Sequence, residues 1–230
     1  LYFRRNGQYK LSKFEDAYRE VYSNPEIMKQ YMNGLLLSTT FWVNHISALQ
    51  FYVERFLPQN KKNYNHVEVG PGHGILLYFA ARDDRAGKVM GWDISPSSVE
   101  ATNRTLMTMG VEAGVELECQ DVFEAAKSGR TFDSIVASEV LEHLESPAKA
   151  LENLHACMNS GGRILVNMPV NSPAPDHIYL VRHPDEVSSL MKEAGFKIEA
   201  SENFPMIGYS VEKALEDEVT INVSVIGRKT

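Results

Sequence analysis

The N-terminal part of the chain carries a helical pattern. Between about residues 14 and 57, apolar side chains recur every three or four positions, which is the spacing of one face of an α-helix. The segment Ser23–Glu26 predicts a helix start, because Pro25 suits a position in the first turn. A second helix is predicted from Ser38 to Phe56, and the polar residues 58–65 that follow predict a linker.

Beyond the linker the pattern changes to short apolar runs that alternate with amphipathic segments. Such alternation is typical of strands and helices that follow one another around a mainly parallel sheet. Strands are predicted at 64–69, 88–93, 115–119, 132–137 and 163–168, with helices between them. The tail differs, because a helix at 184–194 is followed by two strands, 196–202 and 220–226, without a clear long helix between them. This order predicts an antiparallel end to the sheet.

These elements predict an α/β fold with two parts. A helical lid is expected over residues 1–60 and a larger sheet domain over residues 61–230. Segment 167–182 contains three prolines and is predicted to be an irregular loop at the carboxyl end of a strand. Because ligands of open α/β sheets bind at that edge, the functional residues are expected there.

Composition narrows the range of partners. The chain has 230 residues, 43% of them hydrophobic, and a net charge of -7 with a pI near 5.5, which disfavours nucleic acid and favours a small-molecule partner. Cys119 and Cys157 lie far apart and suggest neither a disulfide nor a thiolate metal site, so a cytoplasmic location is expected. No apolar run approaches the roughly 20 residues of a membrane span. The sequence makes no prediction of oligomeric state.

A glycine-rich turn follows the first predicted strand. Glu68 is followed by Gly70, Gly72 and Gly74, where the backbone must turn sharply and let a ligand approach closely. A tight strand-to-helix connection is the alternative. A dinucleotide site prefers the spacing G-x-G-x-x-G, whereas this turn is G-x-G-x-G with an acid before it. An acid there repels phosphate and suits a ligand that carries ammonium and sulfonium charge.

Two further acids follow the next two predicted strands. Asp93 is placed to accept hydrogen bonds from both ribose hydroxyls of a nucleoside cofactor, and Asp121 is placed to accept from an adenine amino group. In each case the alternative is that the carboxylate caps the following helix. An acid after the second strand also suits the ribose of NAD. A nicotinamide-dependent oxidoreductase is therefore one hypothesis for the function of the chain.

At these residues the chain resembles the class I S-adenosylmethionine-dependent methyltransferases. Further matches are Phe132–Leu144, which resembles the fourth-strand motif of the family, and Met158–Ile164, which resembles the turn into strand five; the resemblance covers about residues 65–230. It implies a Rossmann-like seven-stranded methyltransferase sheet with an antiparallel last strand. It also implies S-adenosyl-L-methionine as cofactor.

The resemblance assigns parts of the cofactor to residues of this chain. The loop from Glu68 to Gly74 holds the methionine part, Asp93 the ribose and Asp121 the adenine edge. The remaining residues predicted to line the cofactor site are Ile94, Val122 and Ser138.

A second motif, E-x-x-E-H, lies just past the fourth predicted strand. On one helical turn its members Glu139, Glu142 and His143 would share a face, and His177 in the proline-rich loop is a candidate fourth ligand. Carboxylates with imidazole suit Mg²⁺, Mn²⁺ or Fe²⁺. The alternative is a site without metal, where the first acid borders the cofactor and His143 or His177 acts as general base toward the substrate.

This motif resembles those of the ubiquinone-pathway O-methyltransferases and the small-RNA 2'-O-methyltransferases. Both groups methylate hydroxyl oxygens, and the RNA group needs a basic groove that this acidic chain does not show. We therefore predict methyl transfer to a hydroxyl oxygen of a small-molecule acceptor. The alternatives are an RNA 2'-O-methyltransferase, transfer to nitrogen or carbon of a small molecule, and a non-catalytic cofactor-binding subunit.

The predicted N-terminal helices are rich in aromatic side chains. We expect them to cover the active site and select an aromatic or apolar substrate, the alternative being a helix pair packed on the sheet. The residues concerned are Phe41, Trp42, His45, Phe51 and Tyr52. His66 and His155 are expected at the surface or in helix packing.

Overall fold

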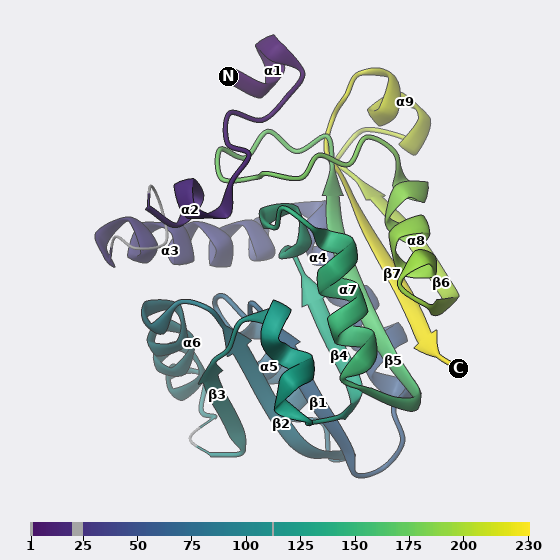
Figure 1. The fold of residues 1–230 in the computed structure, drawn as a ribbon. Helices are drawn as coiled ribbons and strands as arrows, with labels where there is room; N and C mark the ends of the chain where they lie inside the picture. Colours follow the sequence, from purple (N-terminus) through teal and green to yellow (C-terminus); the bar gives the residue numbers. More distant parts are fainter. Residues whose placement is uncertain (1, 20–24, 112) are drawn as a thin grey trace.

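A seven-stranded sheet with helices on both faces organises the chain, as predicted (Figure 1). The computed structural model describes residues 2–19, 25–111 and 113–230. In spatial order the strands run β3-β2-β1-β4-β5-β7-β6. Their bounds are β1 Tyr64–Val69, β2 Ala86–Asp93, β3 Val115–Cys119, β4 Phe132–Ser138, β5 Met158–Val170, β6 Phe196–Pro205 and β7 Ile221–Lys229.

Strand directions explain where a ligand can bind. β1 to β5 are parallel to one another, and β7 is antiparallel to both β5 and β6, which confirms the predicted antiparallel end. After β1 the chain builds β2 and β3 outward on one side and β4 and β5 on the other. The strand order therefore reverses at β1 and β4, and the crevice outside the carboxyl ends of these strands is the ligand-binding position of such sheets.

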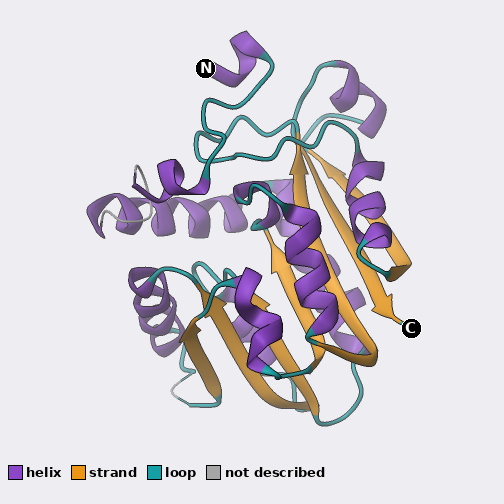
Figure 2. Ribbon diagram, in the orientation of Figure 1, coloured by secondary structure: helices purple, strands orange, loops and turns teal. Residues whose placement is uncertain are grey.

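The helices form a layer on each side of the sheet, as the colouring of Figure 2 makes plain. The α-helices are α1 Tyr2–Asn6, α2 Phe14–Ala17, α3 Pro25–Phe41, α4 Val43–Phe51, α5 Ile75–Ala81, α6 Pro96–Thr108, α7 Pro147–Ala156, α8 Pro184–Glu193 and α9 Val211–Glu216. α7 and α8 pack on the face that presents Ile135 and Ile164, whereas α4 packs on the face that presents Val136 and Leu165. Alternate residues of one strand thus pack into two different hydrophobic cores, one on each face of the sheet.

The predicted helix from 38 to 56 is wrong in its bounds. α3 begins at Pro25, as predicted, and continues to Phe41, and residues 23 and 24 lie outside the described residues. Trp42 is extended, with φ -92° and ψ 123°, and α4 begins after it. A π-helical stretch, η2 (Tyr52–Phe56), and a 3-10 turn, η3 (Leu57–Gln59), complete the segment. The apolar spacing runs unbroken across Trp42, so periodicity does not reveal the break.

Two other expectations need correction. β5 is longer than predicted and ends at Val170, so the proline-rich loop starts at residue 171. His66 is not at the surface: it is fully buried in β1, where its Nδ1 lies 2.9 Å from the Ser134 hydroxyl of β4. A central strand is covered on both faces, which buries even a polar side chain. His155 packs edge to face on Phe196, as expected for helix packing.

None of the helices in the described part of the chain has both the length and the apolar character needed to cross a membrane.

Candidate functional site

The glycine turn after β1 has the left-handed backbone that glycine tolerates. The φ angles are 63° at Gly70, 51° at Gly72 and 76° at Gly74, which is also the N-cap of α5. A Cβ atom added to Gly70 would lie 2.6 Å from Cγ2 of Val140, which follows β4. The turn therefore packs directly on the segment after β4, and at Gly70 there is room only for a hydrogen.

Glu68 is buried without a full set of partners. Its side chain is only 2% exposed, and Oε2 has no hydrogen-bond partner within the described ranges. Burial raises the pKa of this carboxyl well above its usual value, and the backbone amide of Leu77 opposes that rise. A cationic ligand group would favour the ionised form and satisfy the oxygen. The ammonium group of the methionine part of S-adenosylmethionine has this chemistry, so the residue fits the cofactor.

A cavity of about 420 Å³ extends from the glycine turn across the ends of β2 and β3. Four of the residues that the sequence predicts at the cofactor line it together, namely Asp93, Ile94, Asp121 and Val122. Ser138 does not line this cavity; it lies on the larger one described below.

Asp93 and Asp121 also make the local contacts of the capping alternative. Asp93 accepts from the Ser95 amide at 2.9 Å and from the Ser98 hydroxyl at 2.6 Å, and Asp121 accepts from the Phe123 amide at 2.8 Å. Burial raises the pKa of Asp93, and the Ser98 bond opposes the rise. Because an ionised carboxylate has about four acceptor positions, each acid can cap its helix and still accept from a ligand.

A larger cavity of about 980 Å³ lies between the N-terminal helices and the loop after β5. Glu68 and Ser138 line its floor, Trp42 and His45 its lid side, and His177 its loop side. The two cavities have several lining residues in common, namely Tyr31, Leu35, Gly70, Gly72, Glu139 and His143. A donor in the smaller cavity and an acceptor in the larger one would therefore meet beside the glycine turn.

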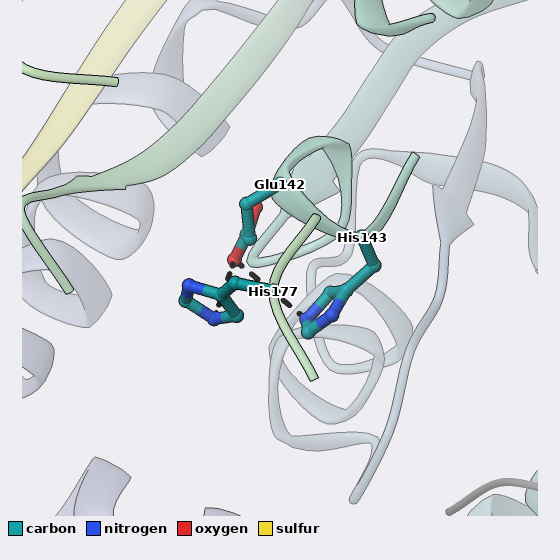
Figure 3. Close-up of side chains that lie close together, drawn as sticks. All are labelled: Glu142, His143 and His177. Carbon is teal, nitrogen blue, oxygen red and sulfur yellow. Dashed lines mark ion pairs between the residues drawn. The ribbon is translucent and has the colours of Figure 1, made fainter. Parts of the chain in front are cut away.

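Glu142, His143 and His177 come together at this junction (Figure 3). One ligand atom of each lies within 4.8 Å of the others. The Glu142 oxygen Oε1 is 3.9 Å from His143 Nε2 and 4.0 Å from His177 Nε2. Glu142 is fully buried, and among the described residues neither of its oxygens has a hydrogen-bond partner. Burial, with the nearby Glu139, raises its pKa well above the usual range.

Glu139 does not share a helical face with this cluster, contrary to the prediction. Its φ is 54°, and the only helical turn of the motif is a 3-10 turn, η5 (Leu141–His143). Its Oε1 instead accepts from the Asn167 and Asn222 amides, each at 3.1 Å. Burial raises the pKa of Glu139 to about 8, although the Asn167 bond opposes it. Glu139 lines both cavities, and the two amides leave its second oxygen, Oε2, unoccupied.

The loop after β5 holds the cluster from outside. The amides of Ile178 and Tyr179 donate to the Glu142 carbonyl at 2.8 and 2.9 Å, and His143 Nδ1 lies 3.2 Å from the Asp176 carbonyl. Burial lowers the pKa of His177 to about 3, with His143 adding to the effect, so His177 is neutral. A neutral imidazole is the form that binds a metal or accepts a proton.

Sequence reasoning missed the polar residues behind Glu139. Asn44 of α4 donates to Asn222 at 2.8 Å, and Ser224 donates to Asn167 at 3.2 Å, so a buried chain of polar side chains joins the N-terminal helices to Glu139. Asn167, Asn222 and Ser224 interrupt apolar strand runs. That interruption is a signal from which they could have been found, because buried polar groups need partners.

The aromatic residues of the N-terminal helices divide between two roles. Phe51 and Tyr52 are buried in the core against the sheet, as the packing alternative predicts. Phe41 and Trp42 are 75% and 52% exposed and line the larger cavity together with His45. The exposed pair gives the cavity an apolar rim.

Comparison with known proteins agrees with this geometry. A family model for the methyltransferase domain matches residues 42–201. Ubiquinone biosynthesis O-methyltransferase from Coxiella burnetii is 24% identical over 140 residues, which cover 61% of this chain and 57% of that protein. The mitochondrial ubiquinone biosynthesis O-methyltransferase of Arabidopsis thaliana is 23% identical, over 71% of this chain and 56% of that protein. The chain thus spans little more than half the length of these relatives.

Among solved structures, the N-methyltransferase NodS from Bradyrhizobium japonicum WM9, in complex with S-adenosyl-L-homocysteine, has a similar fold. Its TM-score is 0.59 at 17% identity, over 80% of this chain and 85% of that chain. At this identity the likeness concerns the fold.

Proposed function

The chain belongs to the methyltransferase domain family, with the class I S-adenosylmethionine-binding fold, and on that premise we propose that it transfers a methyl group to a hydroxyl oxygen of a small-molecule acceptor. The observation that carries the proposal is the junction of the two cavities at Gly70, Glu139 and His143. In-line transfer needs the sulfur and the acceptor oxygen on opposite sides of the methyl carbon, which a donor in one cavity and an acceptor in the other can supply.

The donor side follows from the residues of the smaller cavity. In that cavity Asp93 binds the ribose hydroxyls and Asp121 the adenine edge, while Ile94 and Val122 supply apolar walls. Glu68, which lines the larger cavity beside the glycine turn, binds the ammonium group. The apolar rim of the larger cavity, with Phe41 and Trp42, favours an aromatic or apolar acceptor. In this proposal residues 1–60 form the lid over that acceptor.

We further propose that Glu142, His143 and His177 hold a divalent cation, Mg²⁺, Mn²⁺ or Fe²⁺. The unpartnered, buried carboxyl of Glu142 beside two imidazoles supports this, because a cation would favour its ionised form and coordinate its oxygen. When bound, such an ion orients an acceptor hydroxyl and lowers its pKa. Glu139, whose Oε1 is held by two amides, receives the hydroxyl proton from its position on both cavities.

In the version of this mechanism without metal, His143 receives the proton, because it also lines both cavities. An amine acceptor, as the name of NodS indicates for that protein, is the second candidate. The buried acid Glu139 favours a hydroxyl acceptor, since a hydroxyl must lose its proton to become a good nucleophile.

The two cysteines are both unpaired thiols, which supports a cytoplasmic location within the same proposal.

The test is methyl transfer by the purified protein. Tritiated S-adenosylmethionine is offered with phenols, catechols, carboxylates, amines and short RNA, and calorimetry compares S-adenosylhomocysteine with NAD. We expect binding of S-adenosylhomocysteine alone and methylation of a phenol or catechol. Cofactor binding without any methylated product would support the non-catalytic alternative, and NAD binding would support the oxidoreductase.

The metal is tested separately with chelator and with Glu142→Gln. We expect EDTA to suppress turnover, Mg²⁺ or Mn²⁺ to restore it, and the variant to lose it while still binding S-adenosylhomocysteine. The matched control is Glu152→Gln, an exposed acid of the following helix α7 that lines neither cavity. Undiminished turnover in excess chelator, with an active Glu142→Gln, would refute the proposed metal site. The mechanism in which His143 receives the hydroxyl proton would then remain.

A further inference from the structure

An N-terminal strap, residues 2–17, lies across the outer side of the candidate metal cluster. It lies outside the 42–201 segment that matches the methyltransferase domain. In Figure 1 its helices α1 and α2 lie beyond the sheet, on the same side as α3. Three of its side chains are buried against the rest of the molecule: Phe3, Leu11 and Ala17. The strap is therefore packed in place rather than loosely attached.

Hydrogen bonds fasten the strap at three points. Arg4 donates to the Glu218 carbonyl, Arg182 donates to the Gly7 carbonyl, and the Phe14 amide donates to Glu145 at 3.0 Å. Arg182 lies in the loop after β5, and Glu145 lies just after η5. The strap is thus attached to the segments that carry His177 and His143.

Tyr9 reaches from the strap to the cluster. Its hydroxyl lies 3.3 Å from His177 Nδ1, and its ring meets the imidazole edge to face at 5.5 Å between centroids. Phe3 also packs on the tyrosine ring, at 5.3 Å between centroids. His177 Nε2, the opposite ring nitrogen, is the atom that lies 4.0 Å from Glu142. The tyrosine therefore contacts His177 at the nitrogen that faces away from the cluster.

We propose that Tyr9 is a positioning residue, which orients His177 through Nδ1 so that Nε2 faces the ligand cluster. The proposal rests on the proposed metal site, since the cluster is what His177 would serve. A ligating histidine commonly bonds its other ring nitrogen to a second group that fixes the ring and the tautomer. The usual groups are carboxylates, backbone carbonyls and water; here a side chain from outside the matched domain takes that place.

A hydroxyl suits this position because it can both donate and accept. In the proposed arrangement His177 Nδ1 carries the ring proton and donates it to the Tyr9 oxygen, which leaves the lone pair of Nε2 on the side of the Glu142 carboxyl. Phenylalanine preserves the ring contacts and removes both hydrogen-bond roles.

The experiment compares Tyr9→Phe with wild type and with Tyr2→Phe. Tyr2 is an exposed tyrosine of the same strap, 46% exposed, and serves as the matched control. The first readout is the ¹⁵N spectrum of the imidazoles in metal-free protein, which identifies the tautomer of His177. The second is Mn²⁺ affinity by calorimetry, and the third is S-adenosylhomocysteine affinity with thermal unfolding, which reports whether the fold is intact.

We expect wild type and Tyr2→Phe to show one His177 tautomer, protonated on Nδ1, and Tyr9→Phe to show a mixture. Mn²⁺ should bind Tyr9→Phe about 10- to 100-fold more weakly, as for other partners of metal ligands, while S-adenosylhomocysteine binding and the unfolding temperature change little. An unchanged His177 spectrum in Tyr9→Phe would overturn the proposal. If wild type binds no Mn²⁺, the metal site fails by itself, and the spectrum still decides the role of Tyr9.

Discussion

Replacement of Gly70 by alanine tests how tightly the cofactor turn packs on the segment after β4. A left-handed alanine costs roughly 1–2 kcal/mol relative to a right-handed one, and both Gly70 and Gly72 have this backbone. The two positions differ in space: the new Cβ would lie 2.6 Å from Val140 at Gly70 but 3.5 Å from Leu35 at Gly72, an ordinary contact. Gly72→Ala is therefore a matched control for the backbone cost.

The difference between the two variants measures the overlap with Val140. Overpacking costs typically about 1–3 kcal/mol, so Gly70→Ala should lose roughly that much more free energy of unfolding than Gly72→Ala. Val140 sits between Glu139 and η5, and its displacement should also disturb the junction of the two cavities.

The assay is equilibrium urea unfolding of the two variants and wild type without ligand, followed by calorimetry with S-adenosylhomocysteine. We expect Gly70→Ala to be the less stable variant and to bind the ligand more weakly than Gly72→Ala. Equal free energies of unfolding, within about 0.5 kcal/mol, would refute the inference that this contact is rigid.

Three further substitutions test the cofactor site, a buried histidine and the polar chain. Asp93→Asn should weaken S-adenosylhomocysteine binding on the order of 10- to 100-fold, since it weakens charge-assisted bonds to the ribose. The pKa of His66 is lowered from 6.5 to about 3 by burial, so the unfolded chain binds a proton first as the pH falls below 6.5. Between pH 7.5 and 5.5 wild type should therefore lose about 1.4 kcal/mol more stability than His66→Gln. Asn44→Ala should cost about 1–3 kcal/mol, because it leaves the Asn222 oxygen buried without its donor.

Each of these predictions has a control or a contrary outcome. Asp84→Asn, an exposed acid, should leave ligand binding unchanged, and equal binding by Asp93→Asn would place the ribose elsewhere. Parallel pH profiles of wild type and His66→Gln in urea unfolding would show that the imidazole is not held neutral. Gln50→Ala, exposed on the same helix as Asn44, should be nearly neutral; an equal effect of the two would deny the bond to Asn222.

The sheet was predictable because its strands differ sharply from their surroundings. The predicted bounds of 64–69 and 115–119 agree with β1 and β3, since each is a short run between turn residues. The N-terminal helices were located less well, because the apolar spacing does not mark the single extended residue Trp42. Local periodicity indicates which face of a helix is buried, but it contains little information about where a helix breaks.

Within the candidate site, sequence and structure contributed different facts. Sequence alone determined that Glu68 with three glycines, Asp93 and Asp121 lie at or just after the ends of successive strands, because the carboxyl ends of parallel strands reach the same edge of the sheet. Only the tertiary structure separated Glu139 from Glu142, since a left-handed residue and a 3-10 turn replace the assumed helical turn. It alone also placed Tyr9 on His177, 168 residues apart in the chain. Contacts between segments so distant depend on how whole elements pack, which no spacing within the sequence encodes.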